Sequence, residues 1–406
     1  MIDLHVSRHR PTVAVIDLAA LSDNFHDLYR AAQVAAQGSR AFFFCPMVKA
    51  NAYGHGDLQV VSRLRGLGAS WVGVGLIEEA LHLRSSGDSG RILNFGPFDQ
   101  EGARALLQEE VTPVVSSRAD LQHLIAAIRV LASSDPQWAK PRGVEFHLKI
   151  ETGMNRLGIE YGELDEIVKA LQQAPELRLK GLMTHFASGE DATDLGGRTE
   201  WQMREFERCH QKLTRDLDAD IRDQMLLHVG NSGALLAFST QPRQLAVGFR
   251  PGLALYGGLE KDVGGLRLRP VLSLKSRIAQ TRWIDPGERV SYGGTWTALR
   301  RSLLGVVPCG YADGVRRGLS GKMSVLVKGR RVSVTGVICM DYFMCDLTEV
   351  QDVKVGDEVT LLGRQGHEEI RAENWARELG TISYEVLTGI SERVPRLYVD
   401  ASVGNN

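Results

Sequence analysis

Short apolar runs alternate with amphipathic segments through the N-terminal part of the chain. The apolar runs have the length and the β-branched and aromatic bias of buried strands, at residues 41–48, 71–74, 92–95, 111–115, 144–150, 179–186, 225–229 and 245–249. Between them, apolar residues recur at helical spacing in residues 57–67, 78–84, 119–131, 164–171, 198–213 and 232–238. This alternation predicts a (β/α)8 TIM-type barrel. A doubly wound open sheet is the alternative, and it is disfavoured because no G-x-G-x-x-G turn follows the first strand.

The pattern changes after residue 259. A glycine-rich stretch at 261–265 is typical of a linker, and short strand-like runs follow at residues 272–278, 303–307, 323–327, 331–337 and 358–362. A hairpin turn is predicted at 327–330, and short helices are predicted at 373–379 and 384–390. The chain is therefore divided into a barrel, residues 11–260, and a smaller, mainly β domain, residues 261–406, with which residues 1–10 could also pack. Residues 13–16 are expected to form a strand that leads into a helix ending before Gly38.

Composition narrows the class of protein. The 406 residues are 43% hydrophobic and 24% charged, with a formal net charge of −1, as in an ordinary globular protein of two domains. No basic stripe occurs, so a nucleic-acid partner is not expected. No apolar stretch has membrane-spanning length and the N-terminus lacks an apolar signal core, so the expected location is cytoplasmic, with no membrane contact. The five cysteines are scattered, and Cys339 and Cys345 lack the spacing of a metal site, so reduced thiols and no metal are predicted.

Chemically capable side chains follow the expected strands at the end where barrel enzymes place their active sites. Lys49 ends the first run, within V-K-A-N-A-Y-G-H-G. Others follow the fifth to eighth runs: Lys149, Arg156, His185, Asn231, Ser232 and Arg250. Each alone has an ordinary structural explanation, such as a solvated chain end or a core histidine. Their recurrence at one end of the barrel predicts an active site there.

The types of these residues suggest a cofactor. A lysine at the mouth of a buried strand is partly desolvated, which lowers its pKa and frees its amine as a nucleophile or base. The Ser232 hydroxyl, at a helix start, and the backbone of Gly252 and Leu253 suit a phosphate, which barrels often bind after strands seven and eight. Together they suggest pyridoxal 5'-phosphate held as a Schiff base, with Arg250 at its pyridine nitrogen. A permanent cation cannot protonate that ring, which suits an enzyme that only removes and returns a proton.

The run V-K-A-N-A-Y-G-H-G resembles the cofactor attachment motif of the alanine racemase family. The resemblance continues in family order through L-K-I-E-T-G-M-N-R-L-G, T-H-F, N-S, F-R-P-G-L-A-L-Y-G, V-S-Y-G-G-T-W, P-C-G-Y-A-D-G, I-C-M-D, S-Y-E and R-V-P-R. It spans both expected domains. It implies an isomerase that interconverts L- and D-alanine and supplies D-alanine for cell-wall peptidoglycan.

The resemblance also implies roles for individual residues. It implies that Lys49 and Tyr292 are the two acid/base groups, with Tyr292 supplied by the partner subunit of a head-to-tail homodimer that shares its active sites. It implies a set of residues around the cofactor: Lys49, Tyr53, His185, Asn231, Ser232, Arg250, Gly252, Leu253 and Tyr384. It implies a second set on the alanine side: Arg156, Tyr311, Met340 and Asp341. A lysine at the position of Lys149 is often carbamylated in the family.

The sequence departs from the family at one visible position. The family often has an arginine two residues before the cysteine of its C-M-D motif, near the corridor that admits substrate, where this chain has Val337. That change affects the expected charge of the corridor and the range of substrates. A racemase of broader specificity, acting on serine or other amino acids, is therefore kept as an alternative. A decarboxylase of the same architecture and a non-catalytic carrier of pyridoxal phosphate are further alternatives, disfavoured by Arg250 and by the Tyr292 and Met340 motifs respectively.

Overall fold

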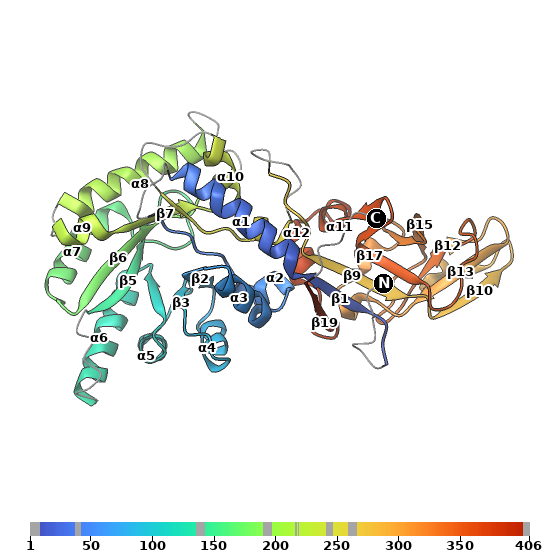
Figure 1. The fold of residues 1–406 in the computed structure, drawn as a ribbon, viewed down its shortest axis with the longest axis horizontal. Helices are drawn as coiled ribbons and strands as arrows, with labels where there is room; N and C mark the ends of the chain where they lie inside the picture. The colour runs from blue at the N-terminus through green and yellow to red at the C-terminus, as the bar shows by residue number, and fades with distance from the viewer. Residues whose placement is uncertain are drawn as a thin grey trace.

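The computed structural model describes residues 9–36, 42–134, 143–189, 197–215, 217, 219–240, 247–258 and 266–400. A helix-covered barrel and a β-rich lobe lie next to each other along the long axis of the molecule (Figure 1). One continuous cluster of buried apolar side chains extends through both lobes, from Ala14 to Val394 in sequence. The two lobes are therefore packed on a common core.

Parallel strands form the wall of the barrel in the order in which they occur along the chain. They are β2 (Trp71–Val74), β3 (Arg91–Asn94), β4 (Thr112–Val115), β5 (Val144–Lys149), β6 (Leu177–Met183), β7 (Leu226–Gly230) and β8 (Gly248–Phe249). Most residues of these strands are buried, as expected of a parallel sheet covered by helices.

Residues 42–48 join the two edges of this sheet. Phe44 pairs with Phe249 of β8, and Met47 pairs with Gly73 of β2, both through isolated parallel bridges. The predicted fold class, a (β/α)8 barrel followed by a mainly β domain, is thus confirmed. The prediction of a regular strand over 41–48 is wrong for the described residues 42–48, because Pro46 has no N–H to donate and interrupts the ladder.

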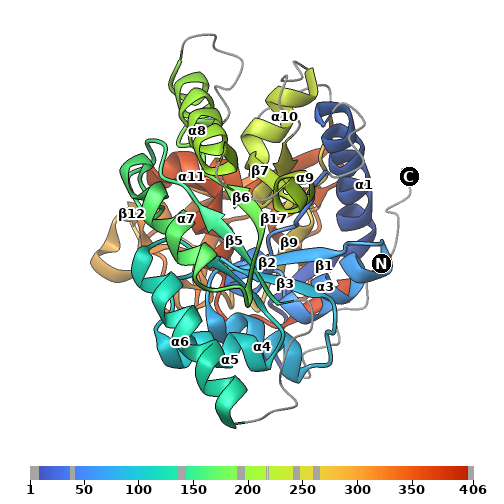
Figure 2. The ribbon, with the colours of Figure 1, turned by 90° about the vertical axis from the view of Figure 1, so that its left-hand side faces the viewer.

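Helices surround the barrel strands (Figure 2). They are α1 (Leu18–Ala35), α3 (Asp57–Gly66), α4 (Ile77–Ser85), α5 (Gln100–Gln108), α6 (Arg118–Ser134), α7 (Leu164–Gln172), α8 (Arg198–Arg215), α9 (Ala219–Gln224) and α10 (Ser232–Thr240). The sequence pattern predicted most of them within a few residues. It did not include α5 or α9; α9 has only six residues, too few to show a clear period, whereas α5 is as long as the predicted α4 and buries Ala103, Leu106 and Leu107 at helical spacing.

The second lobe is built on one large sheet with a small hairpin and two helices. The sheet has the order β10-β13-β16-β15-β14-β17-β9-β1-β19, with β18 beside β17. The bounds are β1 (Val13–Asp17), β9 (Leu272–Arg277), β10 (Gln280–Ile284), β13 (Ser302–Val307), β14 (Ser324–Val327), β15 (Arg330–Thr335), β16 (Phe343–Asp346), β17 (Glu358–Gln365), β18 (Glu368–Ile370) and β19 (Arg396–Val399). The hairpin is β11 (Arg289–Val290) with β12 (Trp296–Thr297), and the helices are α11 (Ala372–Leu379) and α12 (Ser383–Thr388).

Two expectations for this lobe can be compared with the structure. Lys328 and Gly329 both have positive φ, 48° and 73°, between the antiparallel strands β14 and β15, which confirms the predicted hairpin turn. Strand β1 was expected within the barrel segment that begins at residue 11. It pairs instead with β9 and β19, because its alternate side chains fill the face of the larger sheet.

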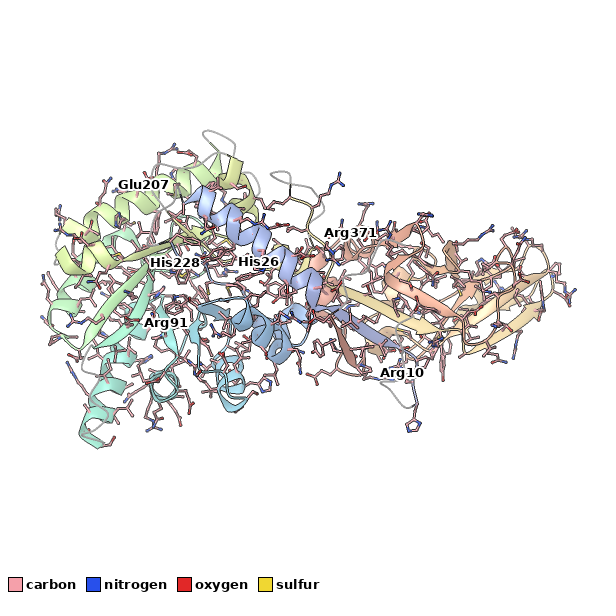
Figure 3. All side chains as sticks on the ribbon, viewed as in Figure 1. Arg10, His26, Arg91, Glu207, His228 and Arg371 are labelled. Carbon is pink, nitrogen blue, oxygen red and sulfur yellow. The ribbon has the colours of Figure 1, made fainter. Side chains whose placement is uncertain are left out.

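Side chains of the second lobe bind the last turn of the barrel. Ser383 Oγ donates to the Gly258 carbonyl at 2.9 Å, and an Arg371 Nη donates to the Gly257 carbonyl at 3.0 Å. Figure 3 shows Arg371 at this junction. Among the helices of the described residues, none has the length and apolarity needed to cross a membrane.

Candidate active site

A pocket of about 330 Å³ opens at the C-terminal ends of the barrel strands. Nearly all residues that the sequence placed at this end line it together: Lys49, Tyr53, Lys149, Arg156, His185, Asn231, Ser232, Arg250, Gly252 and Tyr384. Leu253 begins the short helix η4 (Leu253–Tyr256) immediately after Gly252. Tyr384 is the contribution of the second lobe, from helix α12. Charged and polar groups from strands five to eight and from the closing segment therefore converge on one volume.

The chain turns in an unusual way directly after Lys49. Residues 50–53 of α2 (Lys49–Gly54) have φ of 53°, 53°, 51° and 55°, which is the left-handed helical conformation. That conformation costs about 1–2 kcal/mol for each residue other than glycine. The next two glycines approach the second lobe closely: a Cβ on Gly54 would lie 2.5 Å from the Leu387 carbonyl oxygen, and one on Gly56 would lie 1.8 Å from the Tyr398 hydroxyl. The turn is thus held against the second lobe and presents Lys49 to the pocket.

The surroundings of Lys49 lower its pKa, as the sequence predicted. Burial is the largest cause, and the Arg156 cation acts in the same direction. The Glu79 carboxylate has the opposite effect and partly restores the protonated form. A lysine with this balance of neighbours has more of its amine in the neutral, nucleophilic form at neutral pH than an exposed lysine.

Arg250 is hydrogen-bonded to His228, which is in turn hydrogen-bonded to His147. Its Nη1 donates to His228 Nδ1 at 3.0 Å and to the His228 carbonyl at 2.6 Å, and its Nη2 donates to the Thr184 carbonyl at 2.8 Å. Because a guanidinium only donates, His228 Nδ1 must accept, and the proton of that ring must be on Nε2. That Nε2 lies 2.7 Å from His147 Nδ1, to which it donates. Figure 3 shows His228 in the interior of the barrel.

The charge of Arg250 is preserved in spite of its burial. The side chain is almost fully buried, and burial lowers its pKa to about 10, so it remains a cation at neutral pH. Within the described part of the chain no carboxylate forms an ion pair with it. His185 Nδ1 lies 3.5 Å from its Nη2, at the margin of a hydrogen bond. The guanidinium is therefore a fixed donor whose charge is left for a ligand.

Another side of the pocket has the character of an anion site. Ser232 Oγ accepts the N–H groups of Gly252 at 3.0 Å and Ala254 at 3.3 Å. Asn231 Oδ1 caps the first turn of α10 by accepting the Ala234 N–H at 3.0 Å. Two helix starts, those of α10 and η4, thus meet beside the hydroxyl, which favours a negatively charged group.

The lining of the pocket is also rich in cations. Lys149 is 6% exposed, and burial, Arg156 and Arg250 lower its pKa to about 8. Arg156 follows in the loop after β5, where Glu151 accepts the N–H groups of Gly153 and Arg156. The loop is therefore fixed by its own acidic residue, and the guanidinium of Arg156 is left at the pocket.

Three residues of the expected site lie elsewhere. Tyr292, Tyr311 and Met340 belong to the second lobe, and none of them lines the pocket. They are 72%, 40% and 52% exposed, which is high for large side chains with apolar groups. Tyr311 and Met340 are on neighbouring loops, since the Tyr311 N–H donates to Cys339 and the Ala312 N–H donates to Met340. One chain alone does not bring these residues to Lys49.

The pocket also contains residues that the sequence interpretation missed. They are Met47, Gly75, Phe95, Gly96, Pro97, Leu157 and Met183. Gly75 and the run from Phe95 to Pro97 directly follow β2 and β3, so the same rule of strand ends would have found them. These residues are apolar or glycine and have no acid, base or nucleophilic group, so the sequence did not mark them as site residues.

Buried histidines give a testable pH dependence of stability. His55, His147 and His228 are fully buried, and burial lowers their pKa values to about 4, to about 3 and well below the usual value, respectively. Below about pH 6.5 the unfolded chain binds protons that the folded chain does not, so the free energy of unfolding should fall by up to about 1.4 kcal/mol per pH unit for each histidine. Urea unfolding between about pH 5 and pH 7 measures this slope.

One variant identifies a source of that slope. His55→Asn should flatten it by about one proton, because the change removes one fully buried imidazole. Equal slopes in the natural protein and in His55→Asn would mean that this histidine does not set the acid stability.

Comparison with known proteins follows the same division into two parts. The profile described as alanine racemase, N-terminal domain matches residues 16–260, and that of the C-terminal domain matches residues 271–398. The alanine racemase of Geobacter sulfurreducens is 36% identical over 398 residues, which cover 97% of this chain and 98% of that protein. The alanine racemase of Sorangium cellulosum is 38% identical over 403 residues, which cover 96% and 99%.

Solved structures of alanine racemases are also similar to this chain over nearly its whole length. The alanine racemase of Clostridium difficile 630 has a TM-score of 0.83 at 32% identity, with 96% of both chains covered. The alanine racemase of Bacillus anthracis with bound L-Ala-P has a TM-score of 0.82 at 30% identity, with 96% of this chain and 95% of that chain covered. The fold and the pocket define an isomerase of the racemase class. Within that class, the chain belongs to the alanine racemase family.

Proposed function

We propose that this protein interconverts L- and D-alanine with pyridoxal 5'-phosphate as its cofactor. The observation that carries the proposal is one pocket that combines Lys49 with a buried Arg250 that has no carboxylate partner among the described residues. A decarboxylase of the same architecture would present an acid to the pyridine nitrogen, so Arg250 disfavours that reading. Full-length similarity to alanine racemases supports the choice of reaction.

The residues of the pocket fit this cofactor. The pocket volume of about 330 Å³ is in the range of small-molecule sites. A Cβ at Gly252 would lie 2.3 Å from the Tyr53 hydroxyl, so glycine at this position lets that hydroxyl lie close to the backbone, near Ser232, where a phosphate would bind. Leu253 and Tyr384 would complete the phosphate end, with Asn231 supporting Ser232. When bound, the cofactor would supply an electron sink that acidifies the Cα proton of the amino acid.

Each residue then has a defined task. Lys49 would anchor the cofactor and would transfer a proton on one face of the substrate. Arg250, supported by His185, would donate a hydrogen bond to the pyridine nitrogen and would give it no proton. Arg156 would bind the substrate carboxylate. Lys149 has a pKa lowered to about 8, so more of its amine is neutral than in an exposed lysine, as carbamylation by CO₂ requires, and the resulting anion would hold Arg156.

Racemisation requires a second acid/base group on the opposite face, and we propose that a second copy of the chain supplies it. Tyr292 is the candidate, accompanied by Met340 and Tyr311, which are exposed on the second lobe and absent from the pocket. A head-to-tail homodimer would place these side chains at the neighbouring barrel mouth. Large exposed side chains on such a surface are typical of an interface.

Proton exchange in deuterated water tests the proposal. The purified protein is incubated separately with L-alanine and L-serine, and the Cα deuterium content and chirality of each are followed. Exchange and racemisation of alanine far faster than of serine are expected. Comparable rates would indicate the broader-specificity racemase instead. A protein that binds the cofactor and leaves both amino acids unchanged would indicate a carrier, and the proposed reaction would be wrong.

The cellular role follows from the reaction. D-alanine made in this way would be used for cell-wall peptidoglycan, and the reaction would take place in the cytoplasm. Both statements stay predictions. Growth of a deletion strain without added D-alanine, in a cell with no second racemase, would contradict the first.

A further inference from the structure

The left-handed turn at residues 50–53 has a fixed partner at each end. At its start, Glu79 Oε1 accepts the Ala50 N–H at 2.6 Å, across 29 positions of sequence. At its end, His55 Nδ1 lies 2.9 Å from the Ala52 carbonyl oxygen and 3.0 Å from the Tyr53 carbonyl oxygen. The two residues that face the pocket from this segment, Lys49 and Tyr53, lie at the edges of the turn.

We propose that Glu79 and His55 are positioning residues that clamp the two ends of this turn and thereby fix the Lys49 amine and the Tyr53 ring in the pocket. The clamp itself is a property of the folded chain. Its importance for catalysis rests on the function proposed above.

The carboxylate of Glu79 suits the start of the turn. Its Oε2 accepts the Gly75 N–H at 2.7 Å and the Leu76 N–H at 3.1 Å, so three backbone donors converge on the two oxygens. Capping α4 requires only the Leu76 bond, and the bond to Ala50 adds nothing to that helix. A carboxylate accepts at every position, whereas the amide of glutamine would bring an N–H toward one of the donors. Charge and shape therefore both select glutamate.

The ring of His55 suits the end of the turn. Both partners of Nδ1 are carbonyl oxygens, so Nδ1 carries the proton and donates to them. The ring is fully buried and stacks on Tyr256 at 4.5 Å between centroids, while the Tyr256 hydroxyl donates to the Met47 carbonyl at 2.9 Å. Through Tyr256, the His55 ring is thus connected to the backbone of Met47, which precedes Lys49 in the chain.

Gly75 completes the arrangement. A Cβ at this position would lie 3.5 Å from Lys49 Cδ and 3.6 Å from Glu79 Oε2. Lys49 and Glu79 therefore both lie against this glycine. The charged groups that act on Lys49 are Glu79 from α4, Arg156 from the loop after β5 and Arg250 after β8, with Lys149 at the end of β5. Glu79 is the only anion among them, so its loss also removes the one charge that favours protonated Lys49.

Hydrogen exchange measured by mass spectrometry on the full-length protein tests the clamp. Peptides that cover residues 49–56 should exchange at least about tenfold faster in Glu79→Gln and in His55→Phe than in the natural protein, since local opening sets this rate. Glu78→Gln is the control, because Glu78 precedes Glu79 on α4, is exposed and carries the same charge. His55→Asn should restore slow exchange, because its amide offers an N–H in place of Nδ1.

A second measurement separates positioning from general stability. Loss of the Glu79 charge should shift the pH dependence of the visible absorbance of the lysine-bound cofactor to lower pH in Glu79→Gln, and Glu78→Gln should leave it in place. Unchanged exchange of residues 49–56 in folded Glu79→Gln or His55→Phe would overturn the clamp. If Glu79→Gln does not fold, the His55 pair decides the question. Wild-type racemisation of alanine is measured separately, so a failed clamp leaves the proposed reaction standing.

Discussion

Replacement of Lys49 with alanine is expected to abolish racemisation of alanine, with a fall in kcat/KM of about 10⁴-fold or more. Lys49 is the only lysine that the described structure places both in the pocket and at the end of the barrel's closing segment. In the proposed function, the substitution removes an acid/base group and the anchor of the cofactor together. Production of D-alanine from L-alanine, measured with a D-amino-acid-specific coupled assay, gives the rate.

The control for the Lys49→Ala experiment is the same substitution at a lysine that does not line the pocket. Lys169 lies exposed in the last turn of α7, and Lys169→Ala should retain full activity. Loss of the visible absorbance of the bound cofactor should accompany loss of activity in Lys49→Ala. A Lys49→Ala protein with more than about a tenth of the natural rate would show that another group carries the chemistry, since a positioned acid/base alone is worth 10²-fold or more.

Tyr292→Phe is expected to reduce racemisation in both directions by about 10²–10⁴-fold while the bound-cofactor spectrum survives. The change removes one hydroxyl and leaves Lys49 untouched. Tyr342→Phe is the matched control, because Tyr342 is another exposed tyrosine of the second lobe, 50% exposed against 72% for Tyr292. An unchanged rate in Tyr292→Phe would exclude it as the second acid/base.

The two variants together test whether sites are shared between chains. In a head-to-tail dimer, a Lys49→Ala chain and a Tyr292→Phe chain form one site with both defects and one site with none. Random mixing should therefore restore about a quarter of the natural activity, because half of the dimers are mixed and each has one intact site. Mixing each variant with itself should restore nothing. No recovery after exchange of subunits would mean that each chain builds its own site.

Much of the barrel and its site was predictable because its signals are local. The run 71–74 coincides with β2, and Lys49 and Arg250 stand at strand ends where the barrel rule places chemistry. The irregular closing segment was not predictable to the same degree, since the apolar run that marks a strand also contains Pro46. The left-handed turn after it has two alanines, which prefer right-handed helix, so only its neighbours explain it.

Contacts between segments that are distant in sequence were the second feature that the sequence did not predict. The strand at 13–17 was recognised as a strand, and nothing in its own five residues says that it joins β9 and β19 rather than the barrel. Tyr292 and Met340 had the family resemblance as their only signal, because in one chain both are exposed side chains, Tyr292 at the start of a short 3-10 helix and Met340 on a loop. The role of Glu79 was also hidden, since its partner Ala50 contributes only a backbone N–H.

The position of β1 has a consequence for how the protein is made. β1 lies between β9 and β19, so the first and last described strands of the chain are neighbours in one sheet. During synthesis the N-terminal part emerges first, and most barrel helices and strands can assemble before the second lobe exists. The loop that bears Lys49 must wait, because Arg396 of β19 donates to Gly54 at 3.1 Å and Tyr398 of the same strand packs on Gly56. We therefore expect a chain that ends before β19 to have a largely assembled barrel and a Lys49 turn that lacks its final support.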